Sequence, residues 1–262
     1  MGVNKIIFGG ETVVDLTSDT VTPETLAVGI TAHDKSGNLI TGTMQGGGGG
    51  SEENLLDAFI TNTLTDLNCG APSVAAYGCR GRTNLVTVTL PNAKSVGAQG
   101  FYNCTKLTTV NLPIATSIGS EVFYGCSKLA TVDLSSATSI GEKAFYNCSV
   151  ITSITLPVAT SVEGSTFYKC TKLKKADLGA VTSIGASGFI NCSALVTVIL
   201  RYSGGVVSLA NTNAFSSTPV KSGGTGYVYV PSALVDSYKS ATNWSSFATQ
   251  IRAIEDYPDI CG

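Results

Sequence analysis

Charged residues are scarce in this sequence. Asp, Glu, Lys and Arg make up 13% of the 262 residues, about half of the roughly 25% usual in soluble proteins. The formal net charge of −2 excludes the strongly basic balance of a nucleic-acid-binding chain. The single histidine, His33, leaves little room for histidine-based catalysis or a histidine-rich metal site. We therefore expect no enzyme, no cofactor, no metal ion and no nucleic-acid partner.

Long hydrophobic runs are also absent, although 43% of the residues are hydrophobic and the mean hydropathy is +0.25. The apolar stretches fall far short of the ~18–20 residues that cross a bilayer. The first ten residues, MGVNKIIFGG, lack the apolar segment and cleavage pattern of a secretory signal peptide. The sequence thus predicts no membrane insertion, and assembly inside a cell.

What the sequence does contain is a strong internal 22-residue repeat. Several apolar columns share this one spacing, so each repeat is a structural unit that buries its apolar face against the next unit. The recurring residues are Leu85, Leu107, Leu129, Ile151, Leu173 and Leu195; Val88, Val110, Val132, Ile154, Ala176 and Val198; Leu90, Leu112, Leu134, Leu156, Leu178 and Leu200; Val96, Ile118, Ile140, Val162 and Ile184; Phe101, Phe123, Phe145, Phe167 and Phe189; and Cys104, Cys126, Cys148, Cys170 and Cys192.

One unit, Lys106 to Ser127, shows how a repeat is expected to fold. The end of its segment Leu107 to Leu112 alternates apolar and polar residues, which is typical of a short strand with one buried face. Gly119 is expected at a turn that requires positive φ, as are the glycines at the same position of other units. The residues before Phe123 are expected to form a short helical or 3-10 turn. Coils stacked ~4.8 Å apart then build an elongated body.

The L-x-x-V-x-L strand, followed by Ile-Gly and then Phe-Tyr-x-Cys, resembles the BspA-like leucine-rich repeats over about residues 64–231. The resemblance implies an α/β solenoid of 22-residue coils, right-handed, with a parallel β-sheet on its concave face. The chain departs from the commoner leucine-rich consensus at one column, where alanine replaces the usual Asn or Cys ladder. These residues are Ala93, Ala115, Ala137 and Ala159.

The two ends of the repeat are predicted to differ from its middle. Residues 52–231 are assigned to the solenoid, which opens with a short helix over 52–60 and a degenerate unit in which Cys79 takes a Phe position. A last strand is expected at Val228-x-Val230. Residues 232–262 are assigned to a C-terminal helical cap. In this cap Ser232 begins a helix that runs from Ala233 to Ser240, and Trp244, Phe247, Ile251 and Ile254 follow at helical spacing.

Residues 1–45 are predicted to form a small β-rich module, joined to the solenoid by a linker at residues 46–51. Short apolar runs at Ile6–Phe8 and Val13–Leu16 favour strands. Two further runs, Ile30–His33 and Asn38–Thr43, flank a four-residue turn and predict a hairpin. The five glycines of the linker are not followed by the Lys-Ser or Lys-Thr of a phosphate-binding loop, so a flexible connection is expected.

The run from Val14 to Leu26, continued from Gly29 to Met44, resembles a module near the start of tail-associated proteins of phages and prophages from Gram-positive gut bacteria. This resemblance implies attachment to virion components through residues 1–45 and a location in the virion. A module of this size also suits the assembly of a homo-oligomer.

Eight cysteines raise the question of metal binding or disulfides. Five of them, from Cys104 to Cys192, recur at the repeat spacing and no C-x-x-C motif occurs, which argues against a metal site. Side chains that run parallel into a core do not face one another as a disulfide requires. We therefore expect a column of reduced, buried thiols. Cys69 and Cys261 lie outside the column, and the sequence leaves open whether they pair.

Three weak traces of chemistry do not amount to an active site. His33 lies in or beside a hairpin without a partner motif. The run Asp34-x-Ser36-x-Asn38 only partly matches a calcium-binding loop, since its glycine and its twelfth position do not fit. Asp133 and Asp177 share a column, but nothing in the sequence raises the pKa of either, as a glycosidase acid requires.

The outward side of the predicted strands is the candidate binding surface. Hydroxyl, amide and carboxylate groups at ~4.8 Å intervals match the hydroxyls of a sugar chain or an extended peptide. The alternative is that threonine is simply a good strand former on a solvated face. The candidate residues are Thr87, Thr89, Thr109, Asn111, Thr131, Asp133, Ser153, Thr155, Lys175 and Asp177. A second stripe, which either contacts a ligand or covers the core, is Tyr102, Tyr124, Tyr146 and Tyr168.

Two non-enzymatic functions follow from these expectations. The first is a phage or prophage tail-associated virion protein whose solenoid binds a surface glycan or protein ligand on the host or on mucosa. The second is a bacterial cell-surface adhesin or protein-interaction module of the BspA-like kind. The lack of an export signal in the sequence favours the first.

Overall fold

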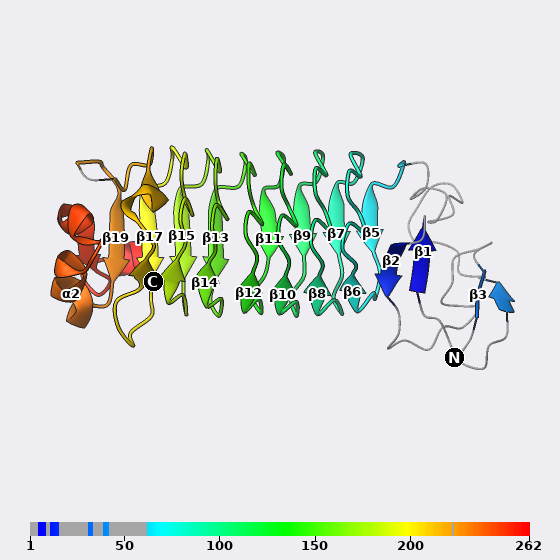
Figure 1. The fold of residues 1–262 in the computed structure, drawn as a ribbon, viewed down its shortest axis with the longest axis horizontal. Coiled ribbons are helices and arrows are strands. Elements are labelled where there is room, and N and C mark those ends of the chain that lie inside the picture. Colours follow the sequence, from blue (N-terminus) through cyan, green and yellow to red (C-terminus); the bar gives the residue numbers. More distant parts are fainter. Residues whose placement is uncertain (1–4, 9–10, 16–30, 34–38, 42–61, 222) are drawn as a thin grey trace.

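The computed structural model describes residues 5–8, 11–15, 31–33, 39–41, 62–221 and 223–262. The predicted glycine linker at 46–51, the predicted helix at 52–60 and the calcium-like run at 34–38 lie outside these residues. Figure 1 shows the repeat region, from β5 to β19, as a row of coils stacked along one long axis, as the 22-residue repeat predicts.

Each coil contributes a first strand at the L-x-x-V-x-L segment. Neighbouring first strands pair in parallel with a shift of one repeat, so that Val110 lies between Val88 and Val132. One sheet has the order β11-β9-β7-β5 and another the order β13-β15-β17-β19-β20. The strands are β5 (Asp66–Asn68), β7 (Thr87–Thr89), β9 (Thr109–Asn111), β11 (Thr131–Asp133), β13 (Ser153–Leu156), β15 (Lys175–Leu178), β17 (Thr197–Leu200), β19 (Tyr227–Val230) and β20 (Ile251–Ala253).

Each coil also contains a short second strand, which the sequence analysis did not predict. It is formed by a Ser-Ile, Ser-Val or Ser-Leu pair, which in four coils stands just before the repeated glycine. The stretch before each Phe forms a turn, and within the described coils only η2 (Thr212–Phe215) is a 3-10 helix. The second strands are β6 (Ser73–Val74), β8 (Ser95–Val96), β10 (Ser117–Ile118), β12 (Ser139–Ile140), β14 (Ser161–Val162), β16 (Ser183–Ile184) and β18 (Ser208–Leu209).

The phenylalanine column forms the centre of the core. The ring centroids of Phe123 and Phe145 lie 5.2 Å apart, and those of Phe145 and Phe167 lie 5.3 Å apart. The column continues through Phe215, 5.4 Å from Phe189, although the loop at 201–206 lengthens that coil. The Phe rings from Phe101 to Phe215 have no solvent exposure, so the coils share one continuous apolar interior.

The repeated glycines are required for a different reason from the one predicted. Gly97, Gly119, Gly141 and Gly185 do not have positive φ. An ideal Cβ at Gly119 would lie 2.7 Å from the backbone nitrogen of Ala98 in the preceding coil. Any side chain there would hold two coils apart. Positive φ falls two residues later, at Gln99, Glu121, Lys143, Ser165 and Ser187.

The cysteine column links the backbones of successive coils. The Cys126 thiol donates to the carbonyl oxygen of Phe101 at 3.1 Å, and the Cys148 thiol donates to that of Phe123 at 3.1 Å. Cys104 makes the same contact with Cys79, which confirms that Cys79 occupies a Phe position. All eight cysteines lie within the described residues, and none of them forms a disulfide. The column therefore consists of reduced thiols, as predicted, and each thiol also fixes one coil to the next.

These thiols are expected to be unreactive in the folded protein. Burial raises the pKa of Cys104 to about 12 and the pKa of Cys148 further, so neither forms the nucleophilic thiolate near neutral pH. We expect a thiol reagent to modify close to eight cysteines in denaturant, but in the native protein to modify half-buried Cys69 first and the column slowly. Fewer than about six titratable thiols in protein purified from the cytosol would contradict a reduced column.

Burial of the thiols also makes stability depend on pH. The folded-state pKa of Cys104 and Cys148 lies above the ordinary value near 9, so their contribution to stability is complete below pH 9. It is lost as the pH rises and the unfolded chain ionises.

Both sheets are interrupted between the third and fourth full coils. Strand β11 does not pair with β13, and β12 does not pair with β14, in the part of the chain that the structure describes. At this seam Glu163 occupies the position that Gly141 and Gly185 hold in neighbouring coils. The amides of those glycines donate to the preceding coil, whereas no such bond is present at Glu163 among the described residues. Gly164 does not compensate, because a Cβ there would meet nothing closer than 3.7 Å.

Replacing Glu163 by glycine is expected to close this seam. The coils remain joined on the turn side, where the Phe145 amide donates to the carbonyl oxygen of Thr166 at 2.9 Å, so removing the Cβ lets the strand side close. Hydrogen exchange at the amide of residue 163 should slow by about tenfold or more, because one protected hydrogen bond forms. Unchanged exchange there would show that the glutamate does not cause the interruption.

The C-terminal cap is only partly helical. The predicted helix is present as η3 (Ser232–Leu234) followed by α2 (Val235–Ser240), but Ser232 makes no side-chain cap. The helical spacing assigned to Ile251 and Ile254 was wrong, because η4 (Ser245–Gln250) ends at Gln250, β20 adds a last strand beside β19, and Ile254 follows that strand in a bend. Trp244 and Phe247 instead cover the end of the Phe column, with centroids 6.0 and 5.6 Å from Phe215.

At the other end, the N-terminal strands follow the prediction. β1 (Lys5–Phe8) and β2 (Glu11–Asp15) pair antiparallel, and β3 (Thr31–His33) pairs antiparallel with β4 (Leu39–Thr41). β2 also pairs with β6, so β1 and β2 extend the sheet of second strands.

Candidate binding surface

The outer face of the first strands carries the predicted polar columns in register. Thr109 lies beside Thr87 and Thr131, and Asn111 lies beside Thr89 and Asp133. Their neighbours Val88 and Val110 point inward and are buried, since successive side chains of a strand alternate between its two faces. The structure thus brings six of the ten candidate residues together on one continuous sheet.

Ser153 and Thr155 continue this face across the seam. Both are exposed on β13, but no strand pairing joins them to Thr131 and Asp133 in the described chain. Ser153 and Thr155 therefore belong to the same outer face but to the next sheet along the rod.

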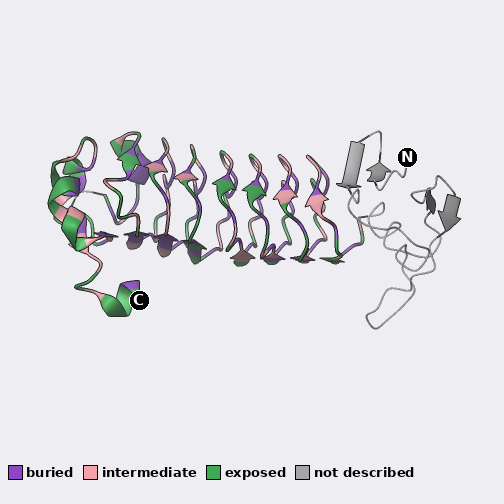
Figure 2. Ribbon diagram, turned by 90° about the horizontal axis from the view of Figure 1, so that it is seen from below, coloured by how far each residue is buried: buried purple, intermediate pink, exposed green. Residues whose placement is uncertain are grey.

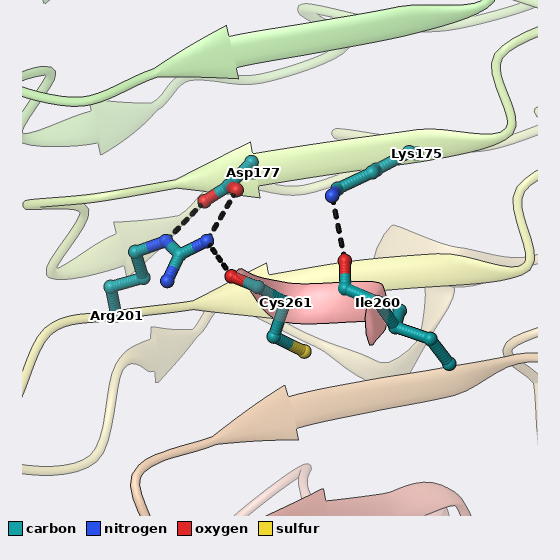
Figure 3. A network of polar contacts seen from close by, with 5 residues as sticks. All are labelled: Lys175, Asp177, Arg201, Ile260 and Cys261. Atoms are coloured by element: carbon teal, nitrogen blue, oxygen red, sulfur yellow. Dashed lines mark hydrogen bonds and ion pairs between the residues drawn. The ribbon is translucent and has the colours of Figure 1, made fainter. Parts of the chain in front are cut away.

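Lys175 and Asp177 are occupied by the chain itself. The Arg201 guanidinium donates to both carboxylate oxygens of Asp177 at 2.8 Å and also to the carbonyl oxygen of Cys261. The Lys175 ammonium donates to the carbonyl oxygen of Ile260 at 2.7 Å. Figure 3 shows how these contacts hold the C-terminal segment against β15 and β17. Asp177 is therefore engaged in an ion pair and is nearly buried.

The C-terminal segment, α3 (Pro258–Cys261) and the residues before it, covers one end of the outer face. Cys261 packs against Ile199 and Tyr229, and Ile254 and Tyr257 complete this small apolar cluster. Figure 2 shows the result, since β15, β17 and β19 are largely buried whereas the strands nearer the N-terminal end keep exposed and half-buried residues. The open part of the face is the outer side of β5, β7, β9, β11 and β13.

The open face begins one coil earlier than the sequence analysis placed it. Asp66 on β5 lies beside Thr87 and accepts hydrogen bonds from the hydroxyls of Thr87 and Thr65. These bonds lower the pKa of Asp66, so the carboxylate stays ionised near neutral pH. The signal that could have found it is Leu67, which pairs with Val88 and occupies the valine column at a spacing one residue short of the repeat.

The tyrosine stripe is a stacked ladder. Ring centroids lie 4.8 Å apart for Tyr102 and Tyr124, 4.5 Å for Tyr124 and Tyr146, and 4.6 Å for Tyr146 and Tyr168. All four tyrosines are half-buried. Arg80 lies over the ring of Tyr102 at 4.9 Å and Lys169 over that of Tyr168 at 5.6 Å. The ring faces are thus used within the ladder, and mainly the ring edges and hydroxyls remain for a ligand.

The family of this chain is decided by its repeat. The model of the BspA type leucine-rich repeat region matches six copies over residues 73–196 and 116–223, which is more than half of the 262 residues. This protein belongs to the BspA type leucine-rich repeat family. The fold class predicted from the columns, an α/β leucine-rich repeat solenoid, is therefore confirmed. No enzyme family is indicated by this match.

Three solved structures are similar to this leucine-rich repeat protein. A leucine-rich cell surface protein from Faecalibacterium prausnitzii shares 20% identity over 88% of this chain and 54% of its own, with a TM-score of 0.54. A leucine-rich repeat protein from Bacteroides ovatus shares 27% identity over 53% of this chain and 42% of its own, with a TM-score of 0.42. A leucine-rich repeat protein of T. pallidum shares 25% identity over 48% of this chain and 72% of its own, with a TM-score of 0.39.

The Faecalibacterium structure shows a shared fold and no more, because its identity to the chain is low. The leucine-rich repeat chain spans about half the length of that protein and of the Bacteroides one. No curated protein matches the chain.

Two general features of the described residues bear on the site. No helix among them is long and apolar enough to cross a membrane. Within the same part of the chain, no group of three or more His, Cys, Asp or Glu residues is placed to hold a metal ion.

Proposed function

We propose that this leucine-rich repeat protein is a non-enzymatic binding module of a bacterial cell surface, which holds an extended ligand along the outer face of β5, β7, β9, β11 and β13. The observation that carries the proposal is the contrast between the two ends of one face. The C-terminal segment covers it over β15, β17 and β19, with contacts to Lys175, Arg201 and Tyr229. Over the first five strands the same face bears polar groups that no segment in the described chain covers.

The chemistry of the open face favours a surface glycan or a protein segment in extended form. A hydroxyl recurs in successive coils at Thr87, Thr109 and Thr131, and Asn111 in the second column adds an amide. Two carboxylates, Asp66 and Asp133, add acceptors. Solenoids of repeated units use such long faces to bind ligands.

A bacterial surface location is supported by the family and by the similarity to the leucine-rich cell surface protein of Faecalibacterium prausnitzii. A virion location is the second candidate. It rests on the resemblance of residues 14–26 and 29–44 to modules of phage tail-associated proteins, and most of these residues lie outside the described ones. Labelling with an antibody separates the two, since signal on intact cells supports the first and signal on purified particles supports the second.

The binding face is tested by blocking it. The variant Thr109→Arg/Thr131→Arg places two long side chains on exposed positions of the open face, whereas Ser117→Arg/Ser139→Arg places them on exposed positions of the second strands in the same coils. Binding to arrayed mucin glycans and matrix proteins should fall at least about tenfold for the first variant and stay within about twofold for the second. Equal binding by both variants would place the ligand elsewhere.

A further inference from the structure

Half of the cations of the chain gather in the turns that lead from the tyrosine ladder into the first strands. The six equivalent segments 80–87, 102–109, 124–131, 146–153, 168–175 and 190–197 contain eight of the chain's 16 Lys and Arg residues and no Asp or Glu. Each segment starts one repeat after the one before it, so these turns stack along one edge of the rod, where the chain enters each first strand (the upper edge in Figure 1). The overall charge of −2 conceals this segregation.

We call the six exposed cations of these turns the basic edge. They are Arg80, Lys106, Lys128, Lys169, Lys172 and Lys174. None of them forms an ion pair with a carboxylate in the part of the chain that is described; the ion pairs there join Lys143 to Glu142, Arg201 to Asp177 and Lys239 to Asp236. The carboxylates of the described residues therefore leave the charges of the edge unpaired.

We propose that the basic edge binds a linear sulfated polysaccharide that runs along the rod. Lys106 and Lys128 occupy one column in successive coils, and Lys172 occupies the same column two coils further on. With coils ~4.8 Å apart, the edge averages one cation per coil: one in each of the first three turns, none at 146–153, three at 168–175 and none at 190–197. A chain that carries about one anion per sugar matches this density, whereas a carboxylated polymer with one charge per two sugars does not.

The groups between the lysines suit a sugar chain. The side-chain amides of Asn103 and Asn147 are exposed at positions where the backbone has positive φ. The hydroxyls of Ser149 and Thr171 donate to the preceding coil at 3.3 and 3.4 Å, which leaves their oxygens free to accept from sugar hydroxyls.

Other polyanions fit this edge less well. Single-stranded nucleic acid needs aromatic faces on which bases stack, but the faces of the ladder tyrosines are covered by one another and by Arg80 and Lys169. An anionic membrane needs a row of apolar side chains to insert beside the cations, and in these turns Val196 is the one strongly exposed aliphatic residue.

The test compares two variants of equal charge. Lys106→Gln/Lys128→Gln/Lys172→Gln removes one column of the basic edge, and Lys94→Gln/Lys143→Gln/Lys239→Gln removes three lysines that lie elsewhere. The probe is a fluorescent heparin oligosaccharide. Its desulfated form, a duplex DNA and anionic lipid vesicles serve as comparison ligands at the same salt concentration. We expect heparin binding to weaken at least about tenfold in the first variant and less than about twofold in the second.

Three outcomes would overturn the proposal. They are no heparin binding by the native chain at low salt, equal loss in both variants, or binding to DNA or vesicles as tight as to heparin. Because the tested lysines lie outside the open face, Thr109→Arg/Thr131→Arg should leave heparin binding intact or slightly stronger. The two proposals therefore fail separately.

Discussion

Replacing Gly141 by alanine is expected to destabilise the protein by about 3 kcal/mol, since overpacking and a lost bond between coils both contribute. The added Cβ would lie 2.5 Å from the backbone nitrogen of Ser120 and 2.6 Å from the carbonyl carbon of Gly119. Backbone atoms cannot move aside as the end of a flexible side chain can, so the coils must separate. Urea unfolding followed by circular dichroism measures the loss.

Gly164 offers the matched control, because a Cβ there would meet nothing closer than 3.7 Å. Replacing Gly164 by alanine is expected to be neutral or to stabilise by up to ~1 kcal/mol, since alanine restricts the unfolded chain more than glycine does. Equal losses at the two positions would show that the close approach of coils is not what the glycine column provides.

Replacing Phe145 by alanine is expected to cost about 3–5 kcal/mol, a large share of the roughly 5–15 kcal/mol that stabilises a typical domain. The ring is fully buried and stacks between Phe123 and Phe167 at 5.2 and 5.3 Å. Its loss leaves a cavity in the middle of the column that rigid coils cannot collapse to fill. The same urea titration measures this loss.

The adjacent Tyr146 separates stacking from burial. Its ring stacks as closely, at 4.5 and 4.6 Å from its neighbours, but it is only half-buried. The change Tyr146→Ala should cost less than half as much as Phe145→Ala, because less apolar area returns to water. A larger loss at Tyr146 would mean that the ladder, and not the Phe column, holds the coils together.

The columns of apolar residues predicted the coils because the residues of one column occupy equivalent buried positions in successive coils. Phe123 and Phe145 share a fixed spacing, and their contact follows from it. The second strands were missed because Ser117 and Ile118 alone are too few to show a strand alternation. The reason predicted for Gly119 was wrong because a repeated glycine looks the same in the sequence whether it is needed for positive φ or for the close approach of two coils. The structure shows the second reason.

The sequence predicted which residues of each strand face outward, but not how much of that face the C-terminal segment covers. Alternation along each strand identified Thr109 and Asn111, and their register confirms one shared face. The cover over Asp177 depends on Cys261, which lies several repeats further along the chain, and no local pattern indicates that contact. The basic edge was missed because net charge sums over the chain, whereas a ligand meets the charges of one edge.

Deleting one repeat tests the stack of 22-residue coils most directly. Removal of segment 107–128 joins Lys106 to Leu129 and preserves every column, whereas removal of segment 107–117 joins Lys106 to Ile118 and shifts all later columns by half a coil. We expect the first variant to fold and to unfold cooperatively like the full chain, and the second, although it loses fewer residues, to lose its structure. A folded half-coil deletion, or an unfolded full-coil deletion with an intact fold in the parent chain, would contradict the coil stack.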